Sequence, residues 1–584
     1  MRHIGKLLSG TILALLVTTP IDAATAPDQI ETAVRPVIAA PADTATPGTV
    51  ATPAAAVDAQ IADKLRAIVS SGQFDKRIER VPEREAMAAF YSAHNYAPLW
   101  LADGKLDARG KSVIAILVNA AADGLDPSDY QVPAFGVGSS PEALADADIT
   151  LTYSVLLYAR HLASGRVAPS RVLSEVDYGD HTPAPSDILK KLDDAADAGA
   201  ALESYNPPHR GFLALKAKLA ELRRNAARVE SVETTAAKSR HGRRAEREPA
   251  RLVATQAAID RVIDNMERWR WLPRQLGETY VMVNVPDYTL KVVHDHQEEW
   301  RTKIVAGKPQ TPTPLLSARM DNVLVNPSWH VPQSIIKNEY LPRYGRDPNI
   351  FVRMGLEVKR NHDGTLSVTQ PPGAHNALGR IKFNFENQFS VYLHDTPQKQ
   401  LFAAAKRDFS HGCMRVENPT KFGEVVMRLA MNGRAPDAEQ LAALFGRSER
   451  TFKLDNGPMV HLTYQTAFVD ENGKLEFRDD VYGMDARIQA ILHSDQRRIA
   501  DLSPAQDAAN DHDNPQANQV VLRRVERAEA ADAFAYFDNL PDLPPRREQR
   551  HVAAHIRPQP ATISPGFHSQ NPSTPFPFLA IFGH

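Results

Sequence analysis

The spacing of apolar residues changes along the chain and divides it into a helical half and a strand-rich half. Between about residues 58 and 225, apolar side chains recur every three to four positions, which predicts a domain of helices with one buried face each. Another helix with this spacing is expected to end at Pro273, because proline cannot continue a helix. Its predicted apolar face comprises Leu252, Ile259, Val262, Ile263, Met266 and Trp269.

Beyond residue 278 the apolar period falls to two, which is typical of strands with one buried face. Residues 380–394 read as a hairpin, and Asn472-Gly473 predicts a turn between strands expected at 451–469 and 474–482. Residues 331–375 are interrupted by Pro, Gly, Arg and Asn, and we expect an irregular excursion from the sheet there. The pattern as a whole predicts an α+β protein with a helical N-terminal domain.

Three polar segments and one apolar segment interrupt this pattern. Residues 25–57 and 226–250 are expected to be disordered linkers, and residues 494–584 a mostly disordered tail, because they contain few large apolar groups to bury. Residues 1–24 resemble an export signal, with a basic start, an apolar run over 7–19 and small residues at 23–26. The mature protein is then expected outside the cytoplasm, in the periplasm, although an uncleaved N-terminal anchor remains open.

Charge and length limit the classes of function. The net charge is −2 and 24% of residues are charged, which gives no overall attraction to nucleic acid or to an anionic membrane. The apolar run over 7–19 is shorter than the roughly 20 residues of a membrane span, and no later segment looks transmembrane. His294 and His296 share a predicted turn but do not make a metal-ligand set.

The single cysteine of the 584 residues, Cys413, is the clearest candidate for chemistry. It cannot form an internal disulfide, so it is either an inert core residue or a reactive thiol. Its flanks are Ser410, His411, Gly412 and Arg415 rather than an apolar run, and such polar and cationic neighbours favour the nucleophilic thiolate. A spare thiol in an oxidising compartment also argues against a purely structural role.

A thiol nucleophile needs a base, and the strand that precedes Cys413 ends in Tyr392-Leu393-His394. Alternation places Tyr392 and His394 on one face of that strand, and the loop that follows is long enough to return Cys413 beside them. His394 as general base and His394 as an ordinary histidine at a strand end both remain open. His411 is adjacent to the nucleophile but is expected to point away, so it ranks behind His394 as base.

Neighbouring groups suggest how a substrate would be held. Gly412 has no Cβ and allows close approach of the backbone to a ligand. The Cys413 backbone N–H, with help from Tyr392, is a candidate oxyanion hole. Arg415 is a candidate for binding a substrate carboxylate, and a structural salt bridge in the loop is an equal alternative.

These segments closely resemble the L,D-transpeptidases with a YkuD-type catalytic domain, in particular the large Gram-negative (YcbB-like) branch that makes 3→3 peptidoglycan cross-links. The resemblance is strong over about 250–490 and weaker in the helical region, at Pro98-Leu99-Trp100 and 123–127. The stretches that carry it are 265–273, 326–332, 370–373, 376–380, 392–397, 401–402 and 407–419.

The resemblance implies a mainly β, sandwich-like catalytic domain over 251–493 and a capping subdomain over about 331–375. It implies that Cys413 attacks the carbonyl between diaminopimelate and the terminal D-Ala of a tetrapeptide stem and forms a thioester. The amine of a second diaminopimelate then attacks that thioester. His394 would move the protons, with the backbone carbonyl of Asp395 orienting its other nitrogen. Ser410, His411 and Arg415 would lie against the substrate.

The partners implied are peptidoglycan stem peptides, with no metal or nucleotide cofactor, and carbapenems are expected to acylate Cys413. One departure stands out, because relatives of this branch often carry a small peptidoglycan-binding domain where this chain has only the polar stretch 226–250. Water or a protein lysine as acceptor would instead give an L,D-carboxypeptidase or a wall-anchoring enzyme. A catalytically silent wall-binding scaffold is a third possibility.

Overall fold

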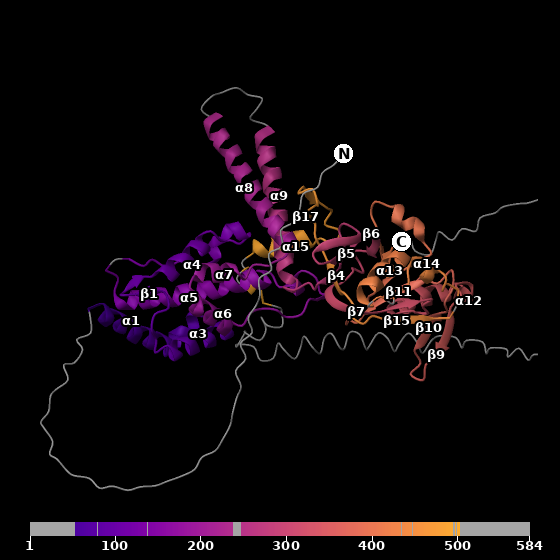
Figure 1. The fold of residues 1–584 in the computed structure, drawn as a ribbon, viewed down its shortest axis with the longest axis horizontal. Coiled ribbons are helices and arrows are strands. Elements are labelled where there is room, and N and C mark those ends of the chain that lie inside the picture. The colour runs from indigo at the N-terminus through magenta and orange to yellow at the C-terminus, as the bar shows by residue number, and fades with distance from the viewer. Residues whose placement is uncertain are drawn as a thin grey trace, which may run out of the picture. The chain divides into compact units, whose positions relative to one another are not determined.

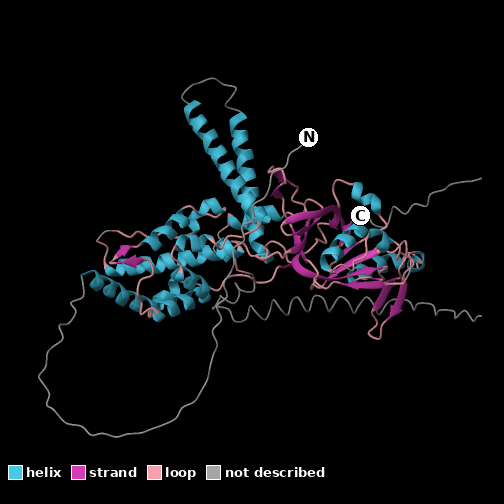
Figure 2. Cartoon of the chain, viewed as in Figure 1, coloured by secondary structure: helices cyan, strands magenta, loops and turns pink. Residues whose placement is uncertain are grey.

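A computed structural model describes residues 53–502, except 79, 137, 237–246, 432, 434, 447, 495, 496 and 498. The predicted signal peptide, most of the N-terminal linker and the tail beyond residue 502 lie outside the described residues. The described part confirms the predicted fold class, a helical region followed by a domain rich in β-strands (Figure 2). None of the helices in this part of the chain combines the length and apolar character needed to cross a bilayer.

The helical region packs around one hydrophobic core that contains Tyr91, Trp100 and Tyr158, all fully buried. Helix α5 contributes the largest buried face, and it starts where the Ser140 hydroxyl accepts a hydrogen bond from the Ala143 N–H ahead of Pro141. Helix α1 begins at Pro53, inside the linker predicted to reach residue 57. The elements are α1 (Pro53–Val69), α2 (Gly72–Arg77), α3 (Val81–Ala93), β1 (Leu101–Ala102), β2 (Lys105–Leu106), α4 (Ala108–Val118), α5 (Pro141–Ser164), α6 (Pro185–Asp194) and α7 (Ala198–Glu203).

Two long helices follow, α8 (Arg210–Ala236) and α9 (Arg247–Trp271), and they run side by side (Figure 1). The polar linker predicted over 226–250 is therefore helical over 226–236 and 247–250, and that prediction of disorder was wrong there. The segment lacks an apolar stripe, but its Ala, Arg and Glu residues favour helix even without burial. Helix α9 ends ahead of Pro273, as predicted, and buries Ile259, Val262, Met266 and Trp269.

The strand-rich domain is built on a mixed sheet whose order is β11-β12-β14-β6-β5-β4-β16-β7-β15. Because β11 also pairs with β7, this path of strands closes on itself around an apolar core. Strands β13 and β3 add to it along β6 and β7. The strands are β3 (Val176–Asp177), β4 (Thr279–Asn284), β5 (Thr289–His294), β6 (Gln297–Gly307), β7 (Leu315–Val325), β11 (Ile381–Phe385), β12 (Leu393–His394), β13 (Asp408–Ser410), β14 (Met414–Val416), β15 (Arg450–Lys453) and β16 (Met459–Thr463).

Helix α13 (Pro419–Ala430) packs its apolar face on this sheet through Phe422, which lies against Phe383 and Trp300. The predicted hairpin 380–394 is present, since β11 and β12 pair with Phe383 opposite Leu393. The predicted turn at Asn472-Gly473 joins β17 (Ala467–Val469) to β18 (Leu475–Phe477). Helices α14 (Ala438–Ala442) and α15 (Met484–Leu492) complete the domain.

Residues 329–378, here called the excursion segment, leave the sheet and form a small unit with its own core. A three-stranded sheet joins β8 (Trp329–His330), β10 (Leu366–Gln370) and β9 (Glu357–Arg360). Short helical turns, α10 (Gln333–Ile335), η4 (Ile336–Tyr340), α11 (Leu341–Tyr344) and α12 (Ile350–Arg353), cover it and bury Ile336 and Tyr340. Residues 331–375 therefore leave the main sheet, as predicted, but they form strands and helical turns rather than an irregular segment. That they cap a site stays a prediction.

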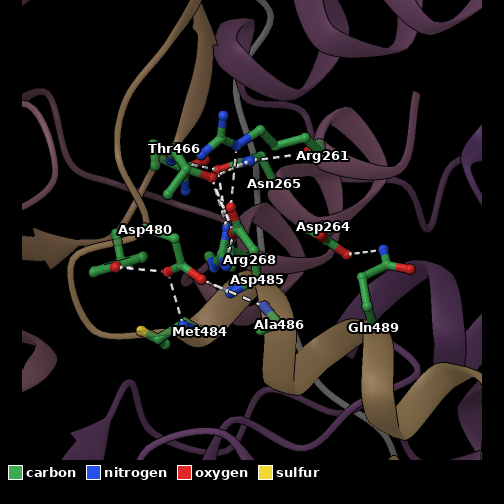
Figure 3. A network of polar contacts seen from close by, with 12 residues as sticks. Arg261, Asp264, Asn265, Arg268, Thr466, Asp480, Met484, Asp485, Ala486 and Gln489 are labelled. Carbon is green, nitrogen blue, oxygen red and sulfur yellow. Dashed lines mark hydrogen bonds and ion pairs between the residues drawn. The ribbon is translucent and has the colours of Figure 1, made fainter. Parts of the chain in front are cut away.

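A polar network fastens α9 to α15 and to the loop after β16 (Figure 3). The Arg268 guanidinium pairs with Asp485, and the Arg261 Nε lies 3.2 Å from the other Asp485 carboxylate oxygen. Asn265, fully buried, accepts from the Thr466 N–H at 2.8 Å. The Gln489 amide donates to Asp264 at 2.5 Å. These contacts hold the helix that precedes the sheet against the last helix of the domain.

Residues 499–502 contact the helical region, although the tail was predicted to be mostly disordered from residue 494. Asp501, whose side chain is 2% exposed, accepts from Arg80 at 2.5 and 2.6 Å and from Arg160 at 2.7 Å. Burial opposes ionisation of Asp501, but the hydrogen bonds and charge of Arg80, with His161 and Arg160, lower its pKa to about 2. This segment is polar, so no apolar pattern in the sequence indicates that Asp501 forms a buried ion pair.

We predict that Asp501→Ala destabilises the protein by about 3 kcal/mol, because it removes the carboxylate paired with the buried Arg80 and leaves Arg160 only its longer contact with Glu83, at 3.4 Å. Urea unfolding monitored by circular dichroism measures the change. Asp146→Ala is the matched control. The side chains of Asp146 and its partner Arg77 are 54% and 33% exposed, so this pair is expected to contribute less than about 1 kcal/mol. Equal losses in the two variants would contradict the prediction.

Asp264 makes the stability depend on pH. Burial raises the pKa of its carboxyl to about 8, above the unfolded value of 3.8, so its contribution is full below pH 4 and is lost as pH rises through 8. Relative to Asp264→Asn, the wild type is expected to lose up to about 1.4 kcal/mol of unfolding free energy per pH unit between these values. Thermal midpoints at pH 5 and pH 8 test this, and parallel pH profiles for the two proteins would disprove it.

Candidate active site

Three neighbouring strands bring the candidate site residues onto one face of the sheet. Strand β12 lies between β11 and β14, with His394 opposite Lys382 on one side and opposite Arg415 on the other. The alternate residues Phe383, Leu393 and Met414 are completely buried in the core. Because side chains alternate across a strand, Lys382, Tyr392, His394, Cys413 and Arg415 share the opposite face.

Cys413 lies immediately before β14, beside Tyr392. Burial raises the pKa of its thiol, and hydrogen bonds from the backbone N–H and hydroxyl of Tyr392 and the charges of Lys382 and Arg415 act in the opposite direction. Burial, together with the neighbouring Cys413, raises the pKa of the Tyr392 hydroxyl as well, so this group remains a phenol that can donate a hydrogen bond. The site at rest therefore holds a thiol next to a phenol.

His394 is buried, and its imidazole is held by hydrogen bonds to the backbone of Asp395 and of Leu378. Its Nδ1 lies 2.5 Å from the backbone carbonyl oxygen of Asp395, and a carbonyl only accepts, so Nδ1 carries the proton. Nε2 is then unprotonated and able to act as a base. Burial, followed by the charge of Arg415, lowers the pKa of the imidazole to about 3. The expected contact between His394 and the Asp395 carbonyl is present.

The candidate base His394 and the candidate nucleophile Cys413 are not directly opposite each other across β12 and β14. Met414 lies opposite Leu393, so Cys413 stands nearest Tyr392, whereas His394 stands opposite Arg415. Among the hydrogen bonds of the described residues, none joins His394 to Cys413. In unliganded sites such bonds are often long and shorten when substrate binds. The Tyr392 and His394 rings lie close together, with their centroids 5.7 Å apart.

The Asp395 side chain, in contrast, holds the loops around the histidine. Its carboxylate accepts from the Arg380 N–H at 2.8 Å, the Thr396 N–H at 2.7 Å and the Lys399 ammonium at 2.7 Å. Gly379 makes this possible, because its φ is +63° and a Cβ there would lie 2.4 Å from the Asp395 carboxylate. The carboxylate therefore has partners of its own, and the orienting role expected of the Asp395 backbone carbonyl stays a prediction.

The loop before Cys413 is held by hydroxyl groups. The Ser410 hydroxyl donates to the Cys413 carbonyl at 2.5 Å and accepts from the Gly412 N–H at 3.2 Å. The buried Thr313 hydroxyl donates to the Gly412 carbonyl at 2.8 Å, and the Tyr482 hydroxyl accepts from the Thr313 N–H at 3.1 Å. Gly412 has a φ of +110°, which favours glycine. The Ser410 hydroxyl is thus engaged within the loop.

His411 contacts the excursion segment, and that it points away from Cys413 stays a prediction. Its Nε2 contacts the Glu339 carboxylate of η4, and the Lys308 ammonium lies 3.3 Å from the same nitrogen. Arg415 donates to the Gln398 side-chain oxygen at 3.1 Å, and burial lowers the pKa of its guanidinium to about 10. That His411, Ser410 and Arg415 contact a substrate stays a prediction.

Lys382, Thr313 and Tyr482 were not predicted from the sequence as neighbours of the site. Alternation along 381–385 places Lys382 opposite the apolar residues of β11 and was the one signal for it; nothing in the sequence links Thr313 or Tyr482 to the loop. A group of possible metal ligands, Glu278, His294 and Asp295, lies where β4 begins and β5 ends, with atoms within 4.8 Å of one another. The His294 Nδ1 there is bonded to the Thr279 hydroxyl at 2.7 Å. These residues are not part of the Cys413 site.

Comparison with family models matches both halves of the chain. A model described as a scaffold domain matches residues 85–219, and one described as the L,D-transpeptidase catalytic domain (YkuD) matches residues 278–447. Residues 278–447 belong to the YkuD family of L,D-transpeptidase catalytic domains. This match spans Lys382, Tyr392, His394 and Cys413, and it supports an acyltransferase type of enzyme.

Similar individual proteins carry the same activity in their names. A curated Haemophilus influenzae protein, "Putative L,D-transpeptidase", is 28% identical over 240 residues, which span 38% of this chain and 48% of the relative. Solved L,D-transpeptidases from Mycobacterium smegmatis and Enterococcus faecium are each 14% identical, with TM-scores of 0.17 and 0.15. They cover 32% and 36% of this chain, and 58% and 62% of their own. Similarity at this level carries no argument about function.

The electrostatics of the site predict its pH dependence. Since the pKa of His394 is lowered to about 3, the imidazole stays neutral at every pH above about 4, while the thiol, with its raised pKa, is protonated at neutral pH. The rate of Cys413 alkylation by iodoacetamide is therefore expected to rise with pH from 6 to 9 without a step near 6.5, the ordinary histidine pKa. A step near 6.5 that disappears in His394→Asn would contradict this assignment.

Proposed function

We propose that the protein is a peptidoglycan L,D-transpeptidase that forms 3→3 cross-links between diaminopimelate residues through a thioester on Cys413. The observation that carries this proposal is one strand face, inside a YkuD domain, that holds a thiol, a phenol and a neutral imidazole whose Nδ1 is bonded to the Asp395 carbonyl. The helical scaffold match supports the large Gram-negative (YcbB-like) branch. With the export signal predicted over 1–24, the proposed location is the periplasm.

In the first half-reaction Cys413 attacks the carbonyl that joins diaminopimelate to the terminal D-Ala of the donor stem. His394 Nε2 takes the thiol proton as the C–S bond forms. The backbone N–H of Cys413 and the Tyr392 hydroxyl donate to the tetrahedral oxyanion. The bond to D-Ala then breaks, its nitrogen takes the proton from His394, and free D-Ala leaves a thioester.

In the second half-reaction the side-chain amine of an acceptor diaminopimelate attacks the thioester carbonyl. His394 Nε2 takes one proton from this amine, the C–S bond breaks, and the sulfur regains the proton as the new amide forms. Water as acceptor would give an L,D-carboxypeptidase, and a protein lysine would give a wall-anchoring enzyme. The excursion segment is proposed as the cap of the site, because its Glu339 contacts His411 next to the nucleophile.

Incubation of the purified protein with a disaccharide-tetrapeptide tests the proposal. Mass spectrometry is expected to show equal amounts of released D-Ala and a 3→3 dimer. In a separate incubation with a carbapenem, the intact mass is expected to show an adduct on Cys413. Cys413→Ala, which keeps the fold but has no nucleophile, is expected to reduce dimer formation by about 10³-fold or more and to abolish the adduct. Tripeptide without dimer would identify the carboxypeptidase, and no D-Ala release from protein with a reduced Cys413 would reject the acyltransferase.

A further inference from the structure

Lys382 shares the strand face of the candidate site residues. It lies on β11 between Ile381 and Phe383, both fully buried, so its side chain leaves the sheet on the side of Tyr392 and His394. It is the cross-strand partner of His394. Its ammonium nitrogen lies 3.9 Å from the centroid of the Tyr392 ring, which fixes the charge over an aromatic face.

No carboxylate among the described residues forms an ion pair with Lys382. The groups that face it are Tyr392 and His394 on β12 and Cys413 and Arg415 on β14, while its partner on β7 is the apolar Leu324. Glu449, at the start of β15, is the acidic group on that side, and its carboxylate already accepts from the Ser328 N–H at 3.0 Å. The half-buried ammonium therefore faces two groups that can become negative, the thiol and the phenol.

We propose that Lys382 is a further residue of the active site, whose ammonium, held by the Tyr392 ring, stabilises negative charge on the Cys413 sulfur. The inference rests on the proposed function only in taking Cys413 as the nucleophile. Lys382 acts while the thiol loses its proton and again when the thioester expels the sulfur, since both steps place negative charge there. It complements His394, which moves the proton, and Tyr392, which donates a hydrogen bond.

The electrostatics of the two groups agree with this geometry. Burial raises the pKa of Cys413 and lowers that of Lys382, so each charge alone is disfavoured. Each group opposes the effect of burial on the other, because a thiolate raises the pKa of Lys382 and an ammonium lowers that of Cys413. Removing the ammonium is thus expected to make the thiolate harder to form.

Alkylation of Cys413 by iodoacetamide, followed between pH 6 and 10 in the full-length protein, tests the proposal. Lys382→Met keeps most of the length of the side chain but loses the charge. It is expected to slow alkylation severalfold at pH 8 and to shift the rise of the alkylation rate to higher pH. Lys382→Arg keeps the charge and is expected to retain most of the wild-type rate. Lys453→Met, at an exposed position of β15 in the same sheet, is the matched control and should react like the wild type.

Near-UV circular dichroism selects folded variants, and Lys382→Gln replaces Lys382→Met if the methionine variant does not fold. An unchanged profile in a folded neutral variant would overturn the proposal. So would equal slowing in Lys382→Arg and Lys382→Met, because that outcome assigns Lys382 a steric role. Alkylation needs no peptidoglycan substrate, so a failed cross-linking assay beside the expected alkylation results would reject the proposed function and leave this inference standing.

Discussion

The register of β11, β12 and β14 is the constraint on which the site depends. Phe383, Leu393 and Met414 are fully buried on one side of these strands, and a slip of one residue would expose them and bury the polar set instead. Burial of three apolar side chains therefore fixes where Tyr392, His394 and Cys413 stand. Helix α13 strengthens this constraint, because its Phe422 packs directly on Phe383.

The second requirement is that the buried polar groups near the thiol find partners. The Thr313 hydroxyl joins the Gly307 N–H, at 2.9 Å, to the Gly412 carbonyl, and the Tyr482 hydroxyl donates to the Gly307 carbonyl at 2.7 Å. Loops at an active site usually move more than the scaffold that carries them. Here hydrogen bonds from two distant parts of the chain hold the backbone of the loop before Cys413.

Local chemistry was readable in the sequence, and long-range partners were not. The neighbours of Cys413 and the alternation through Tyr392 and His394 predicted a common face, because both signals depend on positions close in the chain. Thr313 and Tyr482 lie far from Cys413 in sequence, so no pattern linked them to it. The helix over 226–236 and the buried Asp501 were missed for a related reason: both are polar, and polarity was taken as a sign of disorder.

The cations near the thiol act in opposite directions on the ionisation of Cys413 and of His394. Lys382 and Arg415 make a thiolate easier to form, and the same two charges make an imidazolium harder to form. Burial disfavours both charged forms, so the resting pair is a thiol and a neutral imidazole. A substrate carbonyl changes this balance, because it accepts the sulfur's electron pair and moves the negative charge to an oxygen within reach of new hydrogen-bond donors. In the proposed reaction the proton moves to His394 only as the new bond forms, and until then the protonated thiol resists reagents that require a free thiolate.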